Sequence, residues 1–192
     1  MKNMKTLIIT AHPASWGFAH KIAETYKEAK EQKGGEVEII ELYKQDRQKG
    51  FLDFEAMQDM VTTDDQKFYQ DKIRWADELV FAFPVWWMWC PAILKNWIDW
   101  NMASGFAFKY DENGKHHTLL DGKTARVFMT ADGPDFLYKA LVKPMFSMLW
   151  GKGILGYTGI KMTSMDVFSA MVKKRNDADR EKMLEKVVKR AR

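Results

Sequence analysis

Three short segments combine residue types that could bind a ligand, and each follows an apolar run. The first, His12 to Phe18, holds an imidazole, a hydroxyl and a glycine, and it opens directly into a helical pattern. Amide groups at a helix N-terminus attract anions, Ser15 and His12 could add donors, and Gly17 would let a phosphate approach the backbone closely. The segment matches neither the dinucleotide-binding fingerprint nor the Walker A loop. An ordinary strand-to-helix turn capped by Ser15 is the alternative interpretation.

The second segment, Pro84 to Pro91, is dominated by aromatic rings. It contains three tryptophans, at positions 86, 87 and 89, although loops usually favour Gly, Asn, Asp and Ser. A flat aromatic ligand would explain these rings, because a stacked pair gains roughly 0.5–1.5 kcal/mol beyond its area burial. An aromatic contact between two copies of the chain and a plug in the core are the alternatives. The contact between two copies is compatible with a ligand held at their interface.

The third segment, Thr130 to Gly133, is followed closely by Tyr138. It could present N–H donors and a hydroxyl to the edge of a ring. Prearranged donors of this kind stabilise a ring that gathers negative charge on reduction, as a flavin does. A plain turn around Gly133 and Pro134 is the alternative interpretation.

The elements around these segments alternate between strand and helix patterns. Apolar or β-branched runs predict strands at residues 5–11, 36–42, 78–83, 124–130 and 160–168. Patterns with one apolar face predict helices between them, including a helix that has Pro91 in its first turn. Further helices are expected near residues 54–60, at 145–150, and from Asn176 or Asp177 onward. This alternation predicts one α/β domain, residues 1–192, with an open parallel sheet whose ligands bind beyond the carboxyl ends of the strands.

Composition narrows the class of protein. The chain has 192 residues, 46% hydrophobic and 29% charged, and no apolar run approaches the roughly 20 residues that cross a bilayer. We therefore expect neither membrane insertion nor a signal peptide. The single cysteine, Cys90, excludes an intrachain disulfide and fits a reducing cytoplasm. No metal site is expected, and the adjacent His116 and His117 are interpreted as surface residues of a polar turn.

The net charge of +4 comes from the end of the chain. From Lys173 onward there are nine basic and four acidic residues, so the remaining 21 basic and 22 acidic residues nearly balance. We interpret this as a basic terminal helix. Nucleic-acid binding is not expected, because no groove-reading or stacking element accompanies the basic residues.

Taken together, the three segments resemble the NAD(P)H:quinone oxidoreductase family, that is, DT-diaphorase and its bacterial relatives. The matching stretches follow the family order and are residues 7–13 with Phe18, 83–97, 105–110, 120–123, and 130–133 with Tyr138. The run PAILKNW at 91–97 is the most specific, and the match fades after Tyr138. The resemblance implies a flavodoxin-like fold with strand order 2-1-3-4-5 and helices on both faces. It also implies a homodimer with the active site at the interface, and ping-pong hydride transfer from NAD(P)H through a flavin to a quinone or similar small acceptor.

The resemblance further implies roles for individual residues. The phosphate and ribityl or pyrophosphate region of the cofactor would contact His12, Ser15, Trp16, Gly17, Phe18 and Ala19. The isoalloxazine would contact Pro84, Val85, Trp86, Trp87 and Met88, and its pyrimidine end Thr130, Ala131, Asp132, Gly133 and Tyr138. Tyr138 would be the catalytic residue, handling charge beside the flavin. The substrate would lie against Trp87 and Met88 under Phe108 and Tyr110 of the partner subunit. FAD is the expected cofactor and FMN the alternative.

The sequence also departs from the family pattern. The family's Thr-Thr-Gly-Gly loop has Ala131 and Asp132 at its centre, and the polar residue that follows Phe18 in the family is Ala19 here. The family's catalytic histidine is missing, and Lys143 stands near its place, so the Tyr–His relay is incomplete.

Three rival functions follow. The chain could be a flavodoxin-type electron carrier, although such carriers are usually strongly acidic. It could be a regulatory flavoprotein subunit, for instance of a potassium-efflux system, docked through its basic terminal helix. It could also be an aromatic-rich interaction module that binds no cofactor.

Overall fold

The computed structural model describes residues 3–47, 50–55, 61–170 and 176–192. A five-stranded parallel sheet in the order β2-β1-β3-β6-β7 forms the centre of the protein. Its strands are β1 (Lys5–Thr10), β2 (Glu36–Glu41), β3 (Glu78–Pro84), β6 (Thr124–Thr130) and β7 (Lys161–Phe168). With the two strands of a separate hairpin left out of the numbering, this is the predicted order 2-1-3-4-5. The predicted fold class is confirmed, and the strand ends differ from the predicted ones by at most one residue.

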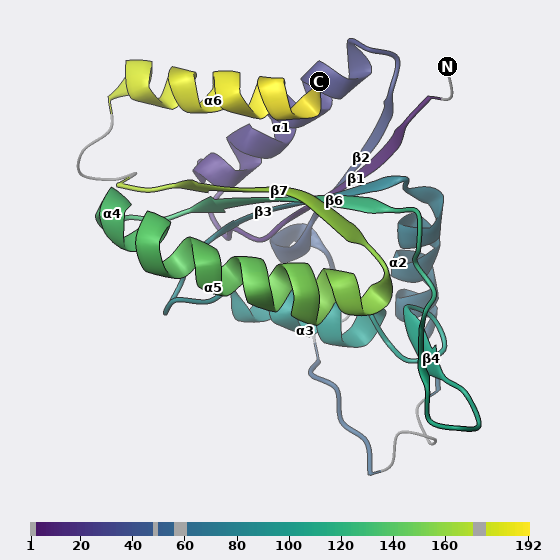
Figure 1. Cartoon of the computed structure of the whole chain (residues 1–192). Helices are drawn as coiled ribbons and strands as arrows, with labels where there is room; N and C mark the ends of the chain where they lie inside the picture. The colour runs from purple at the N-terminus through teal and green to yellow at the C-terminus, as the bar shows by residue number, and fades with distance from the viewer. Residues whose placement is uncertain (1–2, 48–49, 56–60, 171–175) are drawn as a thin grey trace.

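Helices cover both faces of the sheet (Figure 1). Helices α1 (Phe18–Glu31) and α6 (Asp177–Ala191) pack on one face. Helices α2 (Asp64–Trp75) and α3 (Ala92–Asn101) cover the other, together with a continuous helical segment at residues 135–155. Every residue of β3 is buried, because apolar side chains alternate between the two covered faces. Ile8 and Val80 belong to the cluster under α1 and α6, whereas Leu7 and Phe81 belong to the cluster on the opposite face.

The helix ends follow the sequence signals closely. The Thr63 side chain accepts a hydrogen bond from the Gln66 N–H at 3.1 Å and caps α2. Asn176 and Asp179 form a reciprocal capping box at the start of α6, which confirms the predicted start. Pro91 is the N-cap of α3 and not its first helical residue, so this prediction is wrong by one position.

Two segments differ from the prediction. A two-stranded antiparallel hairpin, β4 (Phe108–Tyr110) and β5 (His116–Thr118), occupies the region expected to be a polar turn. The helix expected at 145–150 is the centre of the 135–155 segment, which contains α4 (Asp135–Leu137), α5 (Lys143–Met148) and two π-helical stretches. The helix predicted near residues 54–60 falls mainly on 56–60, outside the described residues.

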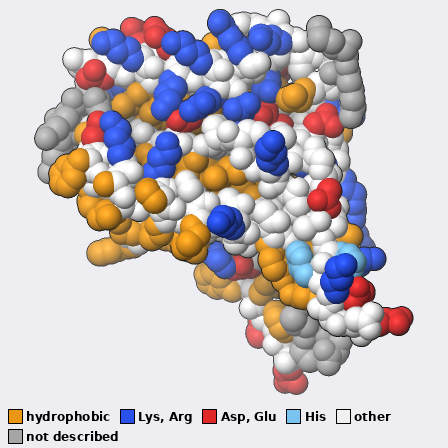
Figure 2. All heavy atoms as spheres, in the orientation of Figure 1, with side chains coloured by type: hydrophobic (Ala, Val, Ile, Leu, Met, Phe, Trp, Pro, Cys, Tyr) orange, Lys and Arg blue, Asp and Glu red, His pale blue; other side chains and the backbone are white. Residues whose placement is uncertain are grey.

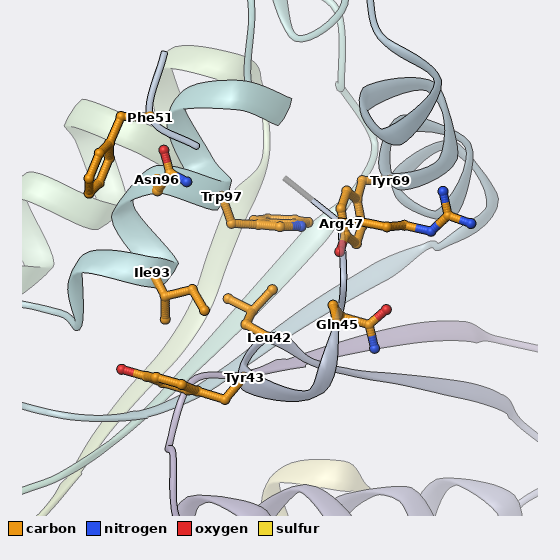
Figure 3. A pocket seen from close by; sticks show the side chains of 9 residues that line it. All are labelled: Leu42, Tyr43, Gln45, Arg47, Phe51, Tyr69, Ile93, Asn96 and Trp97. Carbon is orange, nitrogen blue, oxygen red and sulfur yellow. The ribbon is translucent and has the colours of Figure 1, made fainter. Parts of the chain in front are cut away.

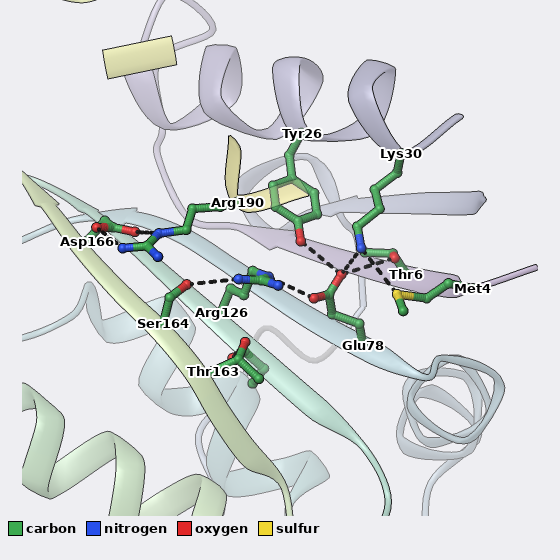
Figure 4. A network of polar contacts seen from close by, with 11 residues as sticks. Met4, Thr6, Tyr26, Lys30, Glu78, Arg126, Thr163, Ser164, Asp166 and Arg190 are labelled. Carbon is green, nitrogen blue, oxygen red and sulfur yellow. Dashed lines mark hydrogen bonds and ion pairs between the residues drawn. The ribbon is translucent and has the colours of Figure 1, made fainter. Parts of the chain in front are cut away.

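A buried network of charged side chains connects α1 to the amino-terminal halves of β3 and β6 (Figure 4). The Glu78 side chain is 2% exposed and lies 2.9 Å from both Lys30 Nζ and Arg126 Nε. The Tyr26 hydroxyl donates a third bond to it at 2.9 Å. Asp166 on β7 holds α6 in the same way through Arg190, at 2.8 Å. Because both carboxylates are buried and paired, removal of a partner from either would leave an uncompensated buried charge.

The surface divides by chemical type (Figure 2). Lysine and arginine side chains gather over α6, while apolar side chains gather where Figure 1 places α4 and the adjoining helix. Phe136, Leu141 and Met148 are among these exposed apolar residues. Within the described ranges, no helix has both the length and the apolar character of a membrane-crossing segment.

Candidate functional site

The three predicted ligand-binding segments start at neighbouring points on one edge of the sheet. Thr10 pairs with Ala82, and Pro84 pairs with Thr130. Backbone bonds continue this alignment into the loops, from Val85 N to the Thr130 carbonyl at 2.7 Å and from Ala11 N to the Ala82 carbonyl at 3.2 Å. The carboxyl ends of β1, β3 and β6 therefore present residues 12–18, 84–89 and 130–133 side by side.

The first loop is a tight turn that ends at the first residue of α1. Gly17 N bonds to the Ala14 carbonyl at 2.9 Å, and Gly17 itself is the N-cap of the helix. No described side chain caps this helix, so the interpretation of Ser15 as the cap is wrong. A Cβ added at Gly17 would lie 2.3 Å from His12 Nδ1. Glycine is therefore needed here because the His12 ring packs directly on the backbone.

His12 is oriented by its own loop. His12 Nδ1 lies 3.1 Å from both the N–H and the carbonyl oxygen of Ala14. Burial lowers the pKa of His12; the bond to the Ala14 carbonyl opposes this and the charge of His20 adds to it, so the net shift is downward. The ring therefore lies beside the start of a helix, where an N–H donor could bond to a phosphate oxygen.

A second histidine, His20, belongs to this loop and was missed in the sequence analysis. Its Nε2 lies 2.9 Å from the His12 carbonyl, and its Nδ1 lies 3.2 Å from Glu41 Oε2. The Thr10 hydroxyl is 3.5 Å from the same Nδ1. The sequence held no local signal for this contact, because Glu41 is 21 positions away and His20 fits an ordinary helical pattern.

The tryptophan loop turns sharply and points its central ring outward. Trp86 and Trp89 exchange two backbone bonds of 2.9 Å, which close a turn around Trp87 and Met88. Both central residues have positive φ, 50° and 58°, a strained conformation that tends to persist at functional sites. The Trp87 side chain is 100% exposed, so the core-plug interpretation is wrong for it. Only Trp89 turns inward, with its ring 5.2 Å from that of Phe146.

The third loop is packed against Tyr138. A Cβ at Gly133 would lie 2.5 Å from Tyr138 Cε2 and 3.2 Å from its hydroxyl oxygen. The Gly133 carbonyl accepts a bond from Ala170 N at 3.2 Å, which ties the loop to the segment after β7. Thr130 and Ala131 are buried, whereas Asp132 is exposed. The phenol is thus held beside the backbone that was expected to face the pyrimidine end.

Phe108 and Tyr110 are not brought to this edge within one chain. Their hairpin lies at the opposite edge of the sheet, where β6 and β7 begin (Figure 1). A strand of seven residues spans about 23 Å, which separates the hairpin from Trp87. The Tyr110 hydroxyl bonds to that of Tyr157, and the His116 ring contacts the Tyr157 ring in a tilted arrangement with a centroid distance of 4.1 Å. His116 is therefore half-buried in an aromatic cluster, contrary to the expectation of a surface residue.

A cavity of about 350 Å³ lies elsewhere, below the carboxyl end of β2 and between α2 and α3 (Figure 3). It is lined by Leu42, Tyr43, Gln45, Arg47, Phe51, Tyr69, Ile93, Asn96 and Trp97. None of the predicted site residues contributes to it. At the predicted site, Trp87 and Met88 are exposed on the single chain. Among the described residues, no group of three or more His, Cys, Asp or Glu is placed to hold a metal ion.

Comparison with known proteins agrees with this arrangement. Residues 4–191 match the family described as having the flavodoxin-like fold. An uncharacterized NAD(P)H oxidoreductase of Haemophilus influenzae is 31% identical over 170 residues, which cover 86% of this chain and 83% of that protein. An FMN-dependent NADH:quinone oxidoreductase of Caldicellulosiruptor bescii is 43% identical over 88 residues, 45% of this chain and 42% of that protein.

A solved structure extends the likeness to the whole fold. The NAD(P)H:quinone oxidoreductase of Methanothermobacter marburgensis superposes with a TM-score of 0.88 at 25% identity, covering 99% of this chain and 98% of that one. The resemblance inferred from the three loops is confirmed, and the chain belongs to the flavodoxin-like fold family in which these NAD(P)H:quinone oxidoreductases are found.

Proposed function

We propose that the chain is a flavin-dependent NAD(P)H oxidoreductase that passes two electrons to a quinone or similar small acceptor. One observation carries the proposal: the ends of β1, β3 and β6 bring a helix N-terminus, an exposed indole and a tyrosine-backed loop to the same edge. These three features match the phosphate, the ring and the pyrimidine end of a flavin nucleotide. The names of the relatives support the same chemistry.

The residues at this edge fit a flavin nucleotide. Its phosphate end would lie at the loop formed by His12, Ser15, Trp16, Gly17, Phe18 and Ala19. Its ring would lie against Pro84, Val85, Trp86, Trp87 and Met88, and its pyrimidine edge against Thr130, Ala131, Asp132 and Gly133. FAD is the cofactor we expect from the sequence around Gly105 to Tyr110, with FMN, which a relative's name specifies, as the alternative.

A bound flavin supplies the two-electron hydride chemistry, so the protein needs few acids or bases of its own. The residues of the chain would hold one edge of the flavin ring toward fixed hydrogen-bond donors. They would leave one face of the ring open for the nicotinamide and the acceptor in turn. Tyr138 is the catalytic residue of this proposal, because its hydroxyl lies beside Gly133 and can donate to a ring edge that gains charge. Asp132 adds a carboxylate at that edge and would disfavour anionic acceptors.

The site calls for a second copy of the chain. Trp87 is fully exposed, and Phe108 and Tyr110 lie at the other edge of the sheet. The 135–155 helical segment runs between the two edges and exposes Phe136 and Leu141 along its length (Figures 1 and 2). Packing two copies antiparallel along this segment would cover the apolar surface. It would also place the hairpin of each copy over the tryptophan loop of the other.

The proposal is tested with the purified protein. We expect it to hold a flavin, to oxidise NADH or NADPH rapidly when a small benzoquinone is present, and to give the parallel double-reciprocal lines of a ping-pong cycle. A flavin-loaded protein that oxidises neither nicotinamide would support an electron carrier instead. A protein that stays colourless after incubation with FAD and FMN would support the cofactor-free interaction module.

A further inference from the structure

We propose that His20, clamped by Glu41, is the positioning residue that sets the 12–17 loop for a phosphate group. The inference rests on the proposed function, since it concerns the same flavin-binding loop. His20 would not touch the ligand itself. It would act through the backbone of His12, which faces the ligand.

The His20 side chain reaches back from the first turn of α1 to the loop before it. It is the third residue of α1, and its side chain is only 14% exposed. The ring reaches the His12 carbonyl on one side, at 2.9 Å, and the end of β2 on the other. One imidazole thus joins the loop, the helix and the edge strand.

The partners of the ring determine where its protons lie. A carbonyl oxygen only accepts, so Nε2 must carry a proton to bond with His12. That leaves Nδ1 facing the Glu41 carboxylate at 3.2 Å and the Thr10 hydroxyl at 3.5 Å. A doubly protonated ring would donate to both His12 and Glu41, and Lys44 holds the same carboxylate at 2.8 Å. The charged and titratable groups around His20 are therefore Glu41, Lys44 and His12.

This clamp fixes the loop in the conformation that a phosphate needs. With its carbonyl held by His20, His12 lays its ring on Gly17 and accepts from the Ala14 N–H at 3.1 Å. The first turn of α1 begins directly after this loop, at Phe18. This effect of the clamp acts on a phosphate and not on the ring of the ligand.

The test compares two flavins that differ only in the phosphate. Affinities for FMN and for riboflavin are measured by fluorescence titration of the flavin-free full chain, in wild type and in His20→Leu. We expect His20→Leu to weaken FMN binding about tenfold, the size of one lost charge-assisted interaction. Riboflavin binding should stay within about twofold.

Two further variants test the clamp itself. His20→Gln should recover part of the FMN affinity, because its amide still has an N–H for the His12 carbonyl. Glu41→Gln should weaken FMN binding selectively, because it removes the charge opposite Nδ1. If His20→Leu does not fold, as judged by circular dichroism, these two variants carry the test. The matched control is Lys72→Leu, which breaks a cation–carboxylate pair of 2.6 Å with Glu38 between α2 and β2 and should change neither affinity.

The outcomes separate the two proposals. A wild-type protein that prefers FMN, with His20 variants that keep that preference, overturns the role of His20 and leaves the proposed function standing. Equal weakening of both flavins also overturns it, because the effect would then be general damage to the loop. A wild-type protein that binds FMN and riboflavin equally overturns the phosphate loop and this inference with it.

Discussion

Replacing Gly17 with alanine tests the loop geometry through a single methyl group. Gly17 has φ −59° and ψ 134°, a conformation open to any residue, so backbone strain plays no part. The new Cβ would lie 2.3 Å from His12 Nδ1 and 2.4 Å from Cγ, so the ring must move. A displaced ring loses its bond from Ala14 N, which contributes about 1 kcal/mol. Alanine is also a poorer N-cap than glycine, by about 1 kcal/mol.

The free energy of unfolding should therefore fall by about 2 kcal/mol, which lowers Tm by about 4–8 °C for a chain of this size. Flavin affinity should fall at least about tenfold, because the His12 donor leaves its place. Thermal melts of the flavin-free protein and fluorescence titration with FMN measure the two effects. The control is Gly50→Ala, whose added Cβ meets nothing within 4 Å. A Gly17→Ala protein that binds FMN as tightly as wild type would refute the assignment of this loop as the phosphate site.

Four other predictions follow from the structure. Glu78→Gln should lower the free energy of unfolding by about 3–5 kcal/mol in urea titrations, because Lys30, 9% exposed, keeps its charge without its partner. Burial raises the pKa of Cys90 to about 12, so the thiol should not react with a disulfide reagent at pH 8 until the protein unfolds. Burial raises the pKa of Asp166, but bonds from two basic side chains of α6 outweigh it, and the net shift is downward. The stability that this carboxylate contributes is thus complete above about pH 4 and is lost as the pH falls below it, and Asp166→Asn should flatten the acid limb of the stability profile. Tyr138→Phe should slow flavin reduction by NAD(P)H at least about 100-fold in stopped-flow traces while flavin retention is unchanged.

Each of these has a result that would count against it. The exposed Lys95–Asp99 pair is the control for Glu78, since breaking it should cost less than about 1 kcal/mol, and equal losses would contradict the argument from burial. Rapid labelling of Cys90 in the folded protein would show that the loop around it opens. An unchanged acid limb in Asp166→Asn would mean that other carboxylates govern acid unfolding. Unchanged flavin reduction would remove Tyr138 from the mechanism.

The sheet was predictable because its strands are buried on both faces. Continuous apolar runs such as that of β3 are typical of strands covered on both faces, and the helices between them fix the parallel direction. The hairpin β4–β5 was not predicted because its three-residue strands carry polar and charged residues, which are typical of a turn. The long helix at 135–155 was underestimated because Pro144, Gly151 and Gly153 weaken its pattern. Packing of Phe146 and Trp150, which are fully buried, overrides that weakness.

The candidate site was predictable in part for a similar reason. Residues that follow parallel strands must meet at one edge, so the grouping of the three loops followed from the strands alone. Contacts between residues that are far apart in the sequence could not be predicted from the strands. The His20–Glu41 pair and the ring contact between His116 and Tyr157 depend on tertiary geometry that no local spacing encodes. Ser15 was the cap of the alternative interpretation because propensity favours a hydroxyl, whereas Gly17 is the N-cap, where the His12 ring packs on its backbone.

A crystal structure of the full chain loaded with its flavin would test the central claim most directly. The account predicts the phosphate at the first turn of α1 and the ring beside Trp87, with Phe108 and Tyr110 of a second copy covering it. A flavin found in the cavity lined by Tyr43, Tyr69 and Trp97, or an edge of the sheet left empty in a flavin-bound protein, would contradict it.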